Sequence, residues 1–155
     1  MNVNSIYSTE NGNLEQLAKL CDITYDLLTK MMNQAESVKS NSYSPYSKFQ
    51  VGCTLLTSSD TLFNGTNVEN VSYGATICAE RSAIVSAISN GEKSIKLYVV
   101  TSNLEEFLTP CGACRQCIVE FGKAKIILMN VKKQCKFTSI DELLPLESVI
   151  SHLKK

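Results

Sequence analysis

Residues 96–130 read "KLYVVTSNLEEFLTPCGACRQCIVEFGKAKIILMN" and hold two apolar runs separated by a more polar segment. The first run, 96–102, is rich in β-branched and aromatic residues, and the second, 124–130, is largely aliphatic, so both favour buried strands. Residues 112–121 between them predict a short helix. Because strands joined through a helix pair in parallel by a right-handed crossover, this stretch predicts an α/β fold.

The segments on either side supply further elements of that fold. Apolar residues recur every three or four positions from 14 to 32, which predicts an amphipathic helix. "FQVGCTLLT" (49–57) and "TLFNGTNVE" (61–69) flank the turn "SSD", so we expect an antiparallel hairpin. The remaining predictions are a polar loop over 37–48, a helix over 78–90 closed by Gly91, an edge strand over 134–138 and a short helix near 146–153.

Together these elements predict a three-layer α/β sandwich, in which a mixed sheet of about five strands is flanked by helices. Residues 1–12 are rich in Asn, Ser and Gly and are expected to form a flexible leader. Neither a repeat nor a linker divides the rest, so residues 13–155 are expected to form a single domain.

The composition argues against several classes of function. Lys plus Arg and Asp plus Glu number 15 each, whereas a protein that holds a polynucleotide by its phosphates carries a basic excess. We therefore expect a small-molecule substrate and no nucleic-acid partner. The N-terminal residues do not resemble a signal peptide, and the longest apolar run, Ile126–Met129, is too short to cross a bilayer. A cytoplasmic protein without a membrane partner is expected, with its seven cysteines as thiols or metal ligands.

Three cysteines stand at the starts of predicted helices. Cys78 opens one helix, and Cys111 and Cys114 open another. A helix N-terminus lowers the pKa of a thiol, and thiolate is the form that binds metal. A Cys-x-x-Cys step is a common half of a tetrahedral zinc site, and three protein ligands leave a fourth position for water, as in catalytic zinc. We therefore predict that Cys78, Cys111 and Cys114 bind one Zn²⁺ per chain.

Glu80 sharpens this interpretation. It lies two residues after Cys78, within reach of a metal-bound water, and "CAE" with "PCGAC" matches the Cys-x-Glu and Pro-Cys-x-x-Cys pattern of zinc deaminases. The alternatives are a redox Cys-x-x-Cys pair, a closed structural zinc, or an iron–sulfur cluster that also uses Cys117. In the deaminase interpretation four cysteines are buried apolar side chains and the only histidine is a surface residue: Cys21, Cys53, Cys117 and Cys135, with His152.

Four blocks in order, "YSPYSKFQVG", "NVENVSYG", "ICAERSA" and "PCGACRQC", resemble the small, homotetrameric cytidine deaminases over about residues 43 to 121. The resemblance implies hydrolytic deamination of cytidine and deoxycytidine to uridine and deoxyuridine with release of ammonia, in pyrimidine salvage. It also implies sites completed by neighbouring subunits. By resemblance, Glu80 shuttles protons, Phe49 contacts the pyrimidine, Asn67 and Glu69 hold the ribose hydroxyls, the backbones of Ala79 and Thr109 meet the base, and Tyr46 and Tyr73 reach across an interface.

The residues themselves support part of this assignment. On a strand, Asn67 and Glu69 share one face because side chains alternate, so an amide and a carboxylate can clamp a pair of hydroxyls. Zinc with three thiolates carries a net negative charge, and the guanidinium of Arg81 beside the sulfurs would reduce it. The sequence departs from the family after Pro145, where Leu146 stands in a position that many members fill with an aromatic residue.

Three rival functions are left open by the sequence. The substrate could be another nucleoside or a nucleoside-like antibiotic, although "NVEN" favours a ribose clamp. A polynucleotide editor is a second rival, against which the zero net charge argues. The third is a non-catalytic zinc-stabilised module, which has no need of a carboxylate such as Glu80 beside its metal.

Overall fold

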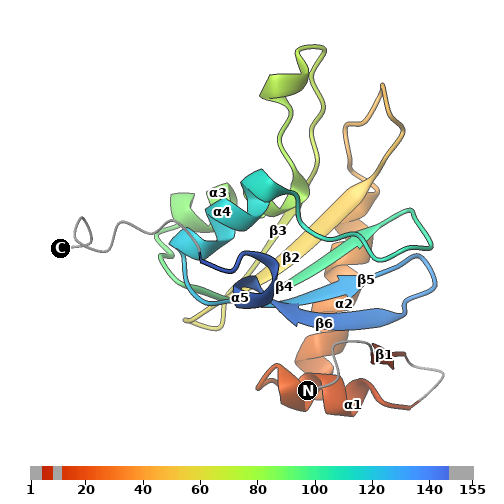
Figure 1. Ribbon diagram of the computed structural model, residues 1–155, viewed down its shortest axis with the longest axis vertical. Coiled ribbons are helices and arrows are strands. Elements are labelled where there is room, and N and C mark those ends of the chain that lie inside the picture. Colours follow the sequence, from red (N-terminus) through yellow and green to blue (C-terminus); the bar gives the residue numbers. More distant parts are fainter. Residues whose placement is uncertain (1–4, 9–11, 147–155) are drawn as a thin grey trace.

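The computed structural model describes residues 5–8 and 12–146. In these residues the strands form one six-stranded sheet in the order β1-β6-β5-β4-β2-β3 (Figure 1). The strands are β1 (Ile6–Tyr7), β2 (Val51–Thr57), β3 (Leu62–Thr66), β4 (Ile95–Ser102), β5 (Lys125–Met129) and β6 (Cys135–Ser139). The helices are α1 (Leu14–Leu20), α2 (Tyr25–Lys39), the 3₁₀ turn η1 (Tyr73–Ala75), α3 (Ala79–Ser89), α4 (Gly112–Glu120) and α5 (Ile140–Leu143). Among the helices of this described part, none has the length and apolar character to cross a membrane.

The pairing predicted from residues 96–130 is confirmed. β4 and β5 are parallel, with Val99 opposite Ile127, and α4 lies in the connection between them. β2 and β3 form the predicted antiparallel hairpin, with Leu55 opposite Phe63. Antiparallel pairs on both sides of the parallel pair make the sheet mixed.

The predicted three-layer arrangement is also confirmed (Figure 1). One face of the sheet packs against α1 and α2, and residues such as Leu28, Val99 and Ile127 form the apolar layer there. The other face packs against α3 and α4, with Tyr98, Ile118 and Ile126 in that layer. Both central strands therefore bury both of their faces, as the nearly continuous apolar runs of β4 and β5 predict.

Gly65 in β3 fixes how closely α3 approaches the sheet. A Cβ atom built at Gly65 would lie 2.4 Å from the carbonyl oxygen of Ala79 and 2.3 Å from the amide nitrogen of Ala83. Both are backbone atoms, so any side chain at this position would push the first turns of α3 away from the sheet. The first turn of α3 carries Glu80, so Gly65 helps to set the position of the candidate site.

Several sequence-based expectations need correction. The helix predicted over 14–32 is two helices, because Asp22 adopts a positive φ of 57° and the side chain of Thr24 caps α2 by accepting a hydrogen bond from Leu27 N–H. α2 then runs on to Lys39, inside the loop predicted over 37–48.

The N-terminal and C-terminal edges also differ from the prediction. Ile6 and Tyr7, within the predicted leader, pair with β6, so the sheet has six strands rather than about five and residues 135–139 are a strand covered in part by β1. Residues 147–153 of the helix predicted near 146–153, and the position of His152, lie outside the described residues.

Candidate metal centre and active site

Two helix starts bring three cysteines together. Cys78 is the N-cap of α3 and Cys111 is the N-cap of α4, both with extended backbone, and Cys114 lies in the first turn of α4. The three Sγ atoms all lie within 4.8 Å of one another, and those of Cys78 and Cys111 are 3.7 Å apart. The sulfurs thus lie at the N-termini of both helices, where the free first-turn N–H groups favour negative charge.

The acid–base properties of the cluster favour thiolate. The pKa of the Cys78 thiol is lowered to about 5, mainly by the hydrogen bond that the Cys114 thiol donates and further by Arg81 and Cys111. The same hydrogen bond, together with burial, raises the pKa of Cys114. The neighbouring thiols and Arg81 therefore favour negative charge within the cluster.

This geometry fits zinc. Tetrahedral zinc with Zn–S bonds of about 2.3 Å places its sulfurs roughly 3.8 Å apart, close to the separation of Cys78 and Cys111. Within the described residues, no fourth histidine, cysteine or carboxylate ligand completes the group. Three soft thiolates suit zinc, and the open fourth position is the arrangement of catalytic rather than structural sites.

The other four cysteines are free thiols outside this cluster. Cys21, Cys53 and Cys135 are buried, as predicted, and burial raises the pKa of Cys21 and of Cys135 to about 12. Cys117 is half-buried on α4, so it is less buried than predicted, but it packs against the core that α3 and α4 share with the sheet.

Glu80 lies against the cysteine cluster. Its side chain is in the first turn of α3 and only 3% exposed, and it lines the same cavity as Cys78 and Cys111. Burial raises the pKa of this carboxyl to about 7. A carboxyl group held in this environment can both accept and release a proton near neutral pH.

Arg81, the residue after Glu80, also contacts the cluster. Its Nη2 donates to the carbonyl of Thr76 at 2.9 Å and to Cys78 Sγ at 3.8 Å. The Cys78 sulfur in turn raises the pKa of the guanidinium, first through this hydrogen bond. The contact predicted from the sequence between Arg81 and a thiolate sulfur is present, and it offsets negative charge at the cluster.

A cavity of about 210 Å³ opens beside the cluster. Its lining residues are Phe49, Val51, Asn67, Glu69, Thr76, Cys78, Ala79, Glu80, Leu108, Thr109 and Cys111. It thus joins residues from four separate parts of the chain, and most of the side chains singled out in the sequence meet in it. Val51, Thr76 and Leu108 were missed, because an apolar or hydroxyl residue in a strand or loop carries no sequence signal for a cavity wall.

Asn67 and Glu69 follow β3, on either side of Val68, so their side chains share one face of an extended segment. The Asn67 side chain donates to the carbonyl of Phe49 at 2.7 Å and accepts from Val51 N–H at 2.9 Å and from the Ser42 hydroxyl at 2.6 Å. These bonds fix the amide at the cavity wall.

The carboxylate of Glu69 is held equally firmly. It accepts hydrogen bonds from the backbone N–H groups of Tyr46 and Ser47, at 3.0 and 3.2 Å, and from the Ser47 hydroxyl. The Ser47 hydroxyl is the main reason that the pKa of Glu69 is lowered. Ser47 was not singled out in the sequence, although its place between Pro45 and Phe49 in a turn makes such a bond to a carboxylate common.

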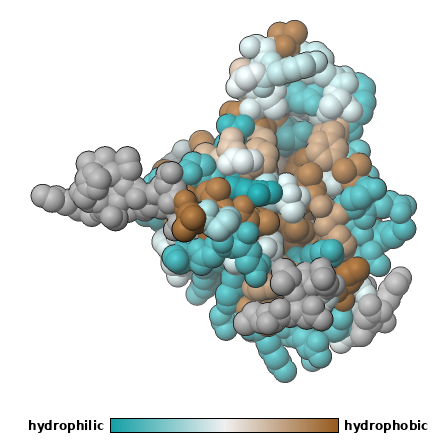
Figure 2. All heavy atoms as spheres, viewed as in Figure 1, coloured by the Kyte–Doolittle hydropathy of each residue, from teal (hydrophilic) through white to brown (hydrophobic). Residues whose placement is uncertain are grey.

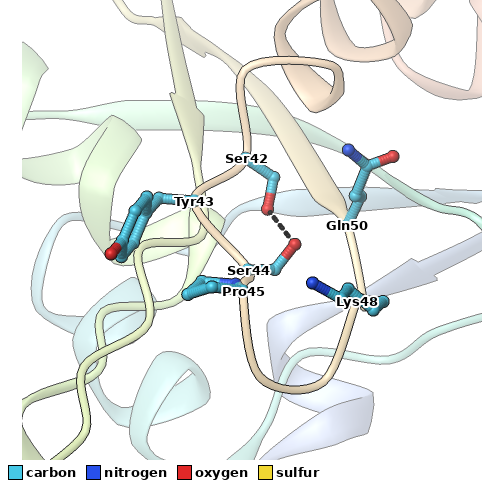
Figure 3. A pocket seen from close by; sticks show the side chains of 6 residues that line it. All are labelled: Ser42, Tyr43, Ser44, Pro45, Lys48 and Gln50. Carbon is cyan, nitrogen blue, oxygen red and sulfur yellow. Dashed lines mark hydrogen bonds between the residues drawn. The ribbon is translucent and has the colours of Figure 1, made fainter.

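The loop that carries Phe49 is itself built around polar contacts. In Figure 3, Ser42 and Ser44 face one another and share a hydrogen bond of 3.1 Å, while Tyr43 points away from them. With Lys48 and Gln50, these residues line a second, more open cavity outside the candidate site. Because Ser42 also donates to Asn67, this loop supports the wall of the site from behind.

Two of the aromatic residues singled out in the sequence lie elsewhere. Tyr46 and Tyr73 line a neighbouring cavity that shares Glu69 and Thr76 with the first. Tyr73 belongs to η1, on an arm that projects from the body of the molecule (Figure 1). Tyr73 is 80% exposed, so within one chain it does not enter the site.

Comparison with known proteins gives a consistent result. Residues 26–130 match the family described as the cytidine and deoxycytidylate deaminase zinc-binding region. A relative from Dictyostelium discoideum, named probable cytidine deaminase, is 46% identical over 119 residues, which is 76% of this chain and 81% of the relative. The cytidine deaminase of Sporosarcina psychrophila is 41% identical over 118 residues, 75% of this chain and 87% of its own.

A solved structure agrees with these sequence relatives. Cytidine deaminase from Burkholderia pseudomallei superposes with a TM-score of 0.75 at 35% identity, over 77% of this chain and 98% of that one. The matched region contains the cysteine cluster, Glu80 and the cavity between them. The chain therefore belongs to the cytidine and deoxycytidylate deaminase zinc-binding family.

Proposed function

We propose that this protein catalyses the hydrolytic deamination of cytidine and deoxycytidine to uridine and deoxyuridine, with release of ammonia. The observation that carries the proposal is the buried carboxyl group of Glu80, which faces a three-cysteine cluster at the end of a nucleoside-sized cavity. A structural metal site has no use for such a carboxyl group. A role in pyrimidine salvage in the reducing cytoplasm fits the seven free thiols.

Cys78, Cys111 and Cys114 would hold one zinc ion per chain, and the metal would lower the pKa of a water molecule and so make it a nucleophile near neutral pH. Glu80 accepts the proton that this water loses and donates it to N3 of the cytosine ring. After the oxygen of this water has bonded to C4, Glu80 takes the remaining proton from that hydroxyl group and passes it to the 4-amino group. The C4–N bond then breaks, C4 keeps the oxygen as a carbonyl, and ammonia leaves. Burial keeps Glu80 away from bulk solvent, so both protons of the water pass through its carboxyl group.

The remaining roles are proposed for residues that line the cavity. Phe49 contacts the face of the pyrimidine, the backbones of Ala79 and Thr109 meet its polar edge, and Asn67 and Glu69 hold the sugar hydroxyls. No lysine, arginine or histidine is among the residues that line the cavity, and the carboxylate of Glu69 would repel a phosphate. These features favour an uncharged nucleoside over a nucleotide or a polynucleotide.

The test is a direct assay of the purified protein. Loss of cytidine absorbance with release of one ammonia per nucleoside is expected, with deoxycytidine also converted. Cytidine monophosphate should react much more slowly, because the cavity offers its phosphate no cation. Faster turnover of the monophosphate, or turnover of single-stranded RNA alone, would contradict the proposal.

Replacing Glu69 by glutamine should weaken nucleoside binding selectively. The amide keeps the size of the side chain but weakens its charge-assisted acceptance of sugar hydroxyls, so we expect KM for cytidine to rise roughly tenfold, since a hydrogen bond to a charged group is worth about 1.5–3 kcal/mol. Steady-state kinetics with cytidine and with cytosine analogues that lack the sugar would check this. Unchanged kinetics with cytidine would remove Glu69 from the clamp.

The same chain is proposed to assemble as a homotetramer whose subunits complete each other's sites. Tyr46, Val71 and Tyr73 are all at least half exposed, and Figure 2 shows a small hydrophobic group at the tip of the arm, surrounded by more polar residues. A second apolar groove of about 390 Å³ lies between α3 and α4 and includes Val85. Exposed aromatic and aliphatic side chains beside a catalytic cavity suit a second copy of the chain.

Replacing Val85 by glutamate should disrupt this assembly. Val85 is 61% exposed in one chain, so the charge should not destabilise the subunit, whereas burying it in an interface would cost several kcal/mol. We expect sedimentation velocity to show smaller species than the wild-type protein and cytidine turnover to fall. Val131→Glu, at another exposed valine away from the groove, is the matched control. A tetramer that survives in the Val85 variant would place the interface elsewhere.

A further inference from the structure

The wall of the cavity nearest Cys111 is formed by a segment that packs against the core through Phe107 and Leu108 but lacks backbone–backbone hydrogen bonds to the rest of the described chain. Leu108 and Thr109 line the cavity, yet residues 106–110 belong to no helix or strand. Among the described residues, no backbone–backbone hydrogen bond involves residues 106–110, and Pro110 has no N–H group to offer. Something other than regular secondary structure must therefore hold this wall in place.

The side chain of Arg115 supplies the missing contacts. From the second turn of α4, its Nε donates to the carbonyl of Pro110 at 2.7 Å and its Nη2 donates to the hydroxyl of Thr109 at 3.2 Å. Its Nη1 donates to the carbonyl of Leu143, at the end of α5, at 2.9 Å. One guanidinium thus connects the cavity wall, the helix that carries Cys114 and the C-terminal part of the described chain.

We propose that Arg115 is a positioning residue for the deamination, which holds Thr109 and Pro110 in register with Cys111 and fixes the path of the chain after Leu143. Arg115 does not line the cavity and does not touch the reacting atoms. It acts through Thr109, which lines the cavity and whose backbone is proposed above to meet the base. This inference rests on the function proposed above.

The chemistry of the guanidinium explains why an arginine stands here. Its donors leave a rigid plane in fixed directions, so Nε, Nη1 and Nη2 can serve three separate acceptors at once. The lysine ammonium is a point charge on a flexible stem, and it could reach the carbonyl of Pro110 or that of Leu143 but not hold both and Thr109 in one geometry. Shape therefore matters more than charge at this position.

The test compares Arg115→Lys and Arg115→Ala with the wild-type zinc protein. Both variants should keep zinc, because Cys78, Cys111 and Cys114 are untouched. We expect kcat for cytidine to fall roughly ten- to a hundredfold, as for a misplaced catalytic wall, while KM changes by less than about twofold. Millimolar methylguanidinium should restore part of the activity of the alanine variant. Lys96→Ala, which removes a cation paired with Asp60 on the far hairpin, is the matched control.

Amide hydrogen exchange provides a readout that does not need activity. Exchange in peptides covering 140–146 should be faster in both Arg115 variants than in the wild-type protein, because the carbonyl of Leu143 loses its donor beside the hydrogen-bonded amides of Ile140 and Leu144. Protease cleavage within residues 104–111 should also be faster, because Thr109 and Pro110 lose their donor. If the wild-type protein fails to deaminate cytidine, the proposed function fails, and these two measurements still decide whether Arg115 anchors the wall. Unchanged exchange, unchanged kcat, or activity lost only together with zinc would each overturn the inference.

Discussion

Replacing Glu80 by glutamine is expected to abolish cytidine turnover while leaving the bound zinc in place. A positioned general acid–base contributes about 10²–10⁴ in rate, and Glu80 is assigned two successive proton transfers, so kcat should fall at least about a thousandfold. The carboxyl group is 3% exposed, which leaves bulk water poorly placed to replace it. Single-turnover kinetics with cytidine, together with metal analysis of the same sample, would measure both quantities.

The substitution should leave the fold intact. Glutamine has the shape of glutamate, and the buried environment of Glu80 already disfavours the charged carboxylate, as its pKa of about 7 reflects. We therefore expect no loss of thermal stability. Glu105→Gln is a suitable control, because Glu105 pairs with Lys132 at the surface and lies outside the cavity. Turnover within tenfold of the wild type would assign the proton transfers to another group, and loss of zinc would make Glu80 part of the metal site.

The parts of the fold that the sequence predicts are those set by local pattern. The apolar runs of β4 and β5 are visible as composition alone, and the connection through α4 then requires their parallel pairing. The cysteine cluster follows from Cys78 and Cys111 standing at helix starts, a placement that capping and periodicity make predictable. The sequence thus predicts those parts of the site in which neighbouring residues along the chain determine the local conformation.

The parts that were missed depend on contacts between distant residues or on single backbone angles. The apolar periodicity continues from Leu17 in α1 to Leu28 in α2. Only the positive φ of Asp22, between the two helices, reveals that two helices replace one. The pairing of Ile6 with Lys136 joins residues 130 positions apart, and two residues carry too little pattern to predict a strand. The bond from Arg115 to Leu143 is similarly beyond any local signal.

Replacing Cys114 by serine should remove zinc and activity together. A hydroxyl group is a much poorer zinc ligand than a thiolate, and two remaining cysteines cannot complete the site. We expect less than about a tenth of the wild-type zinc after dialysis and no detectable cytidine turnover, measured by metal analysis and by ammonia release. Added zinc should not restore the activity, and iron in the wild-type protein instead of zinc would contradict the assigned metal.

Stability should fall as well, because metal bound only to the folded state stabilises that state. At a free zinc concentration a hundredfold above Kd the gain is about 2.7 kcal/mol, which corresponds to roughly 5–10 °C in Tm for a chain of this size. Chelation of zinc from the wild-type protein should lower Tm by a similar amount, whereas the Cys114 variant should no longer respond to the chelator.

Cys117→Ser separates this site from a four-cysteine alternative. Cys117 lies on the same helix, one turn beyond Cys114, but it is not part of the group of converging sulfurs. The variant should therefore retain one zinc per chain and near wild-type turnover, with a Tm that still drops on chelation. Loss of zinc would mean that Cys117 can reach the metal and close its fourth position. A closed site would leave no place for water, so Glu80 would have no proton to accept.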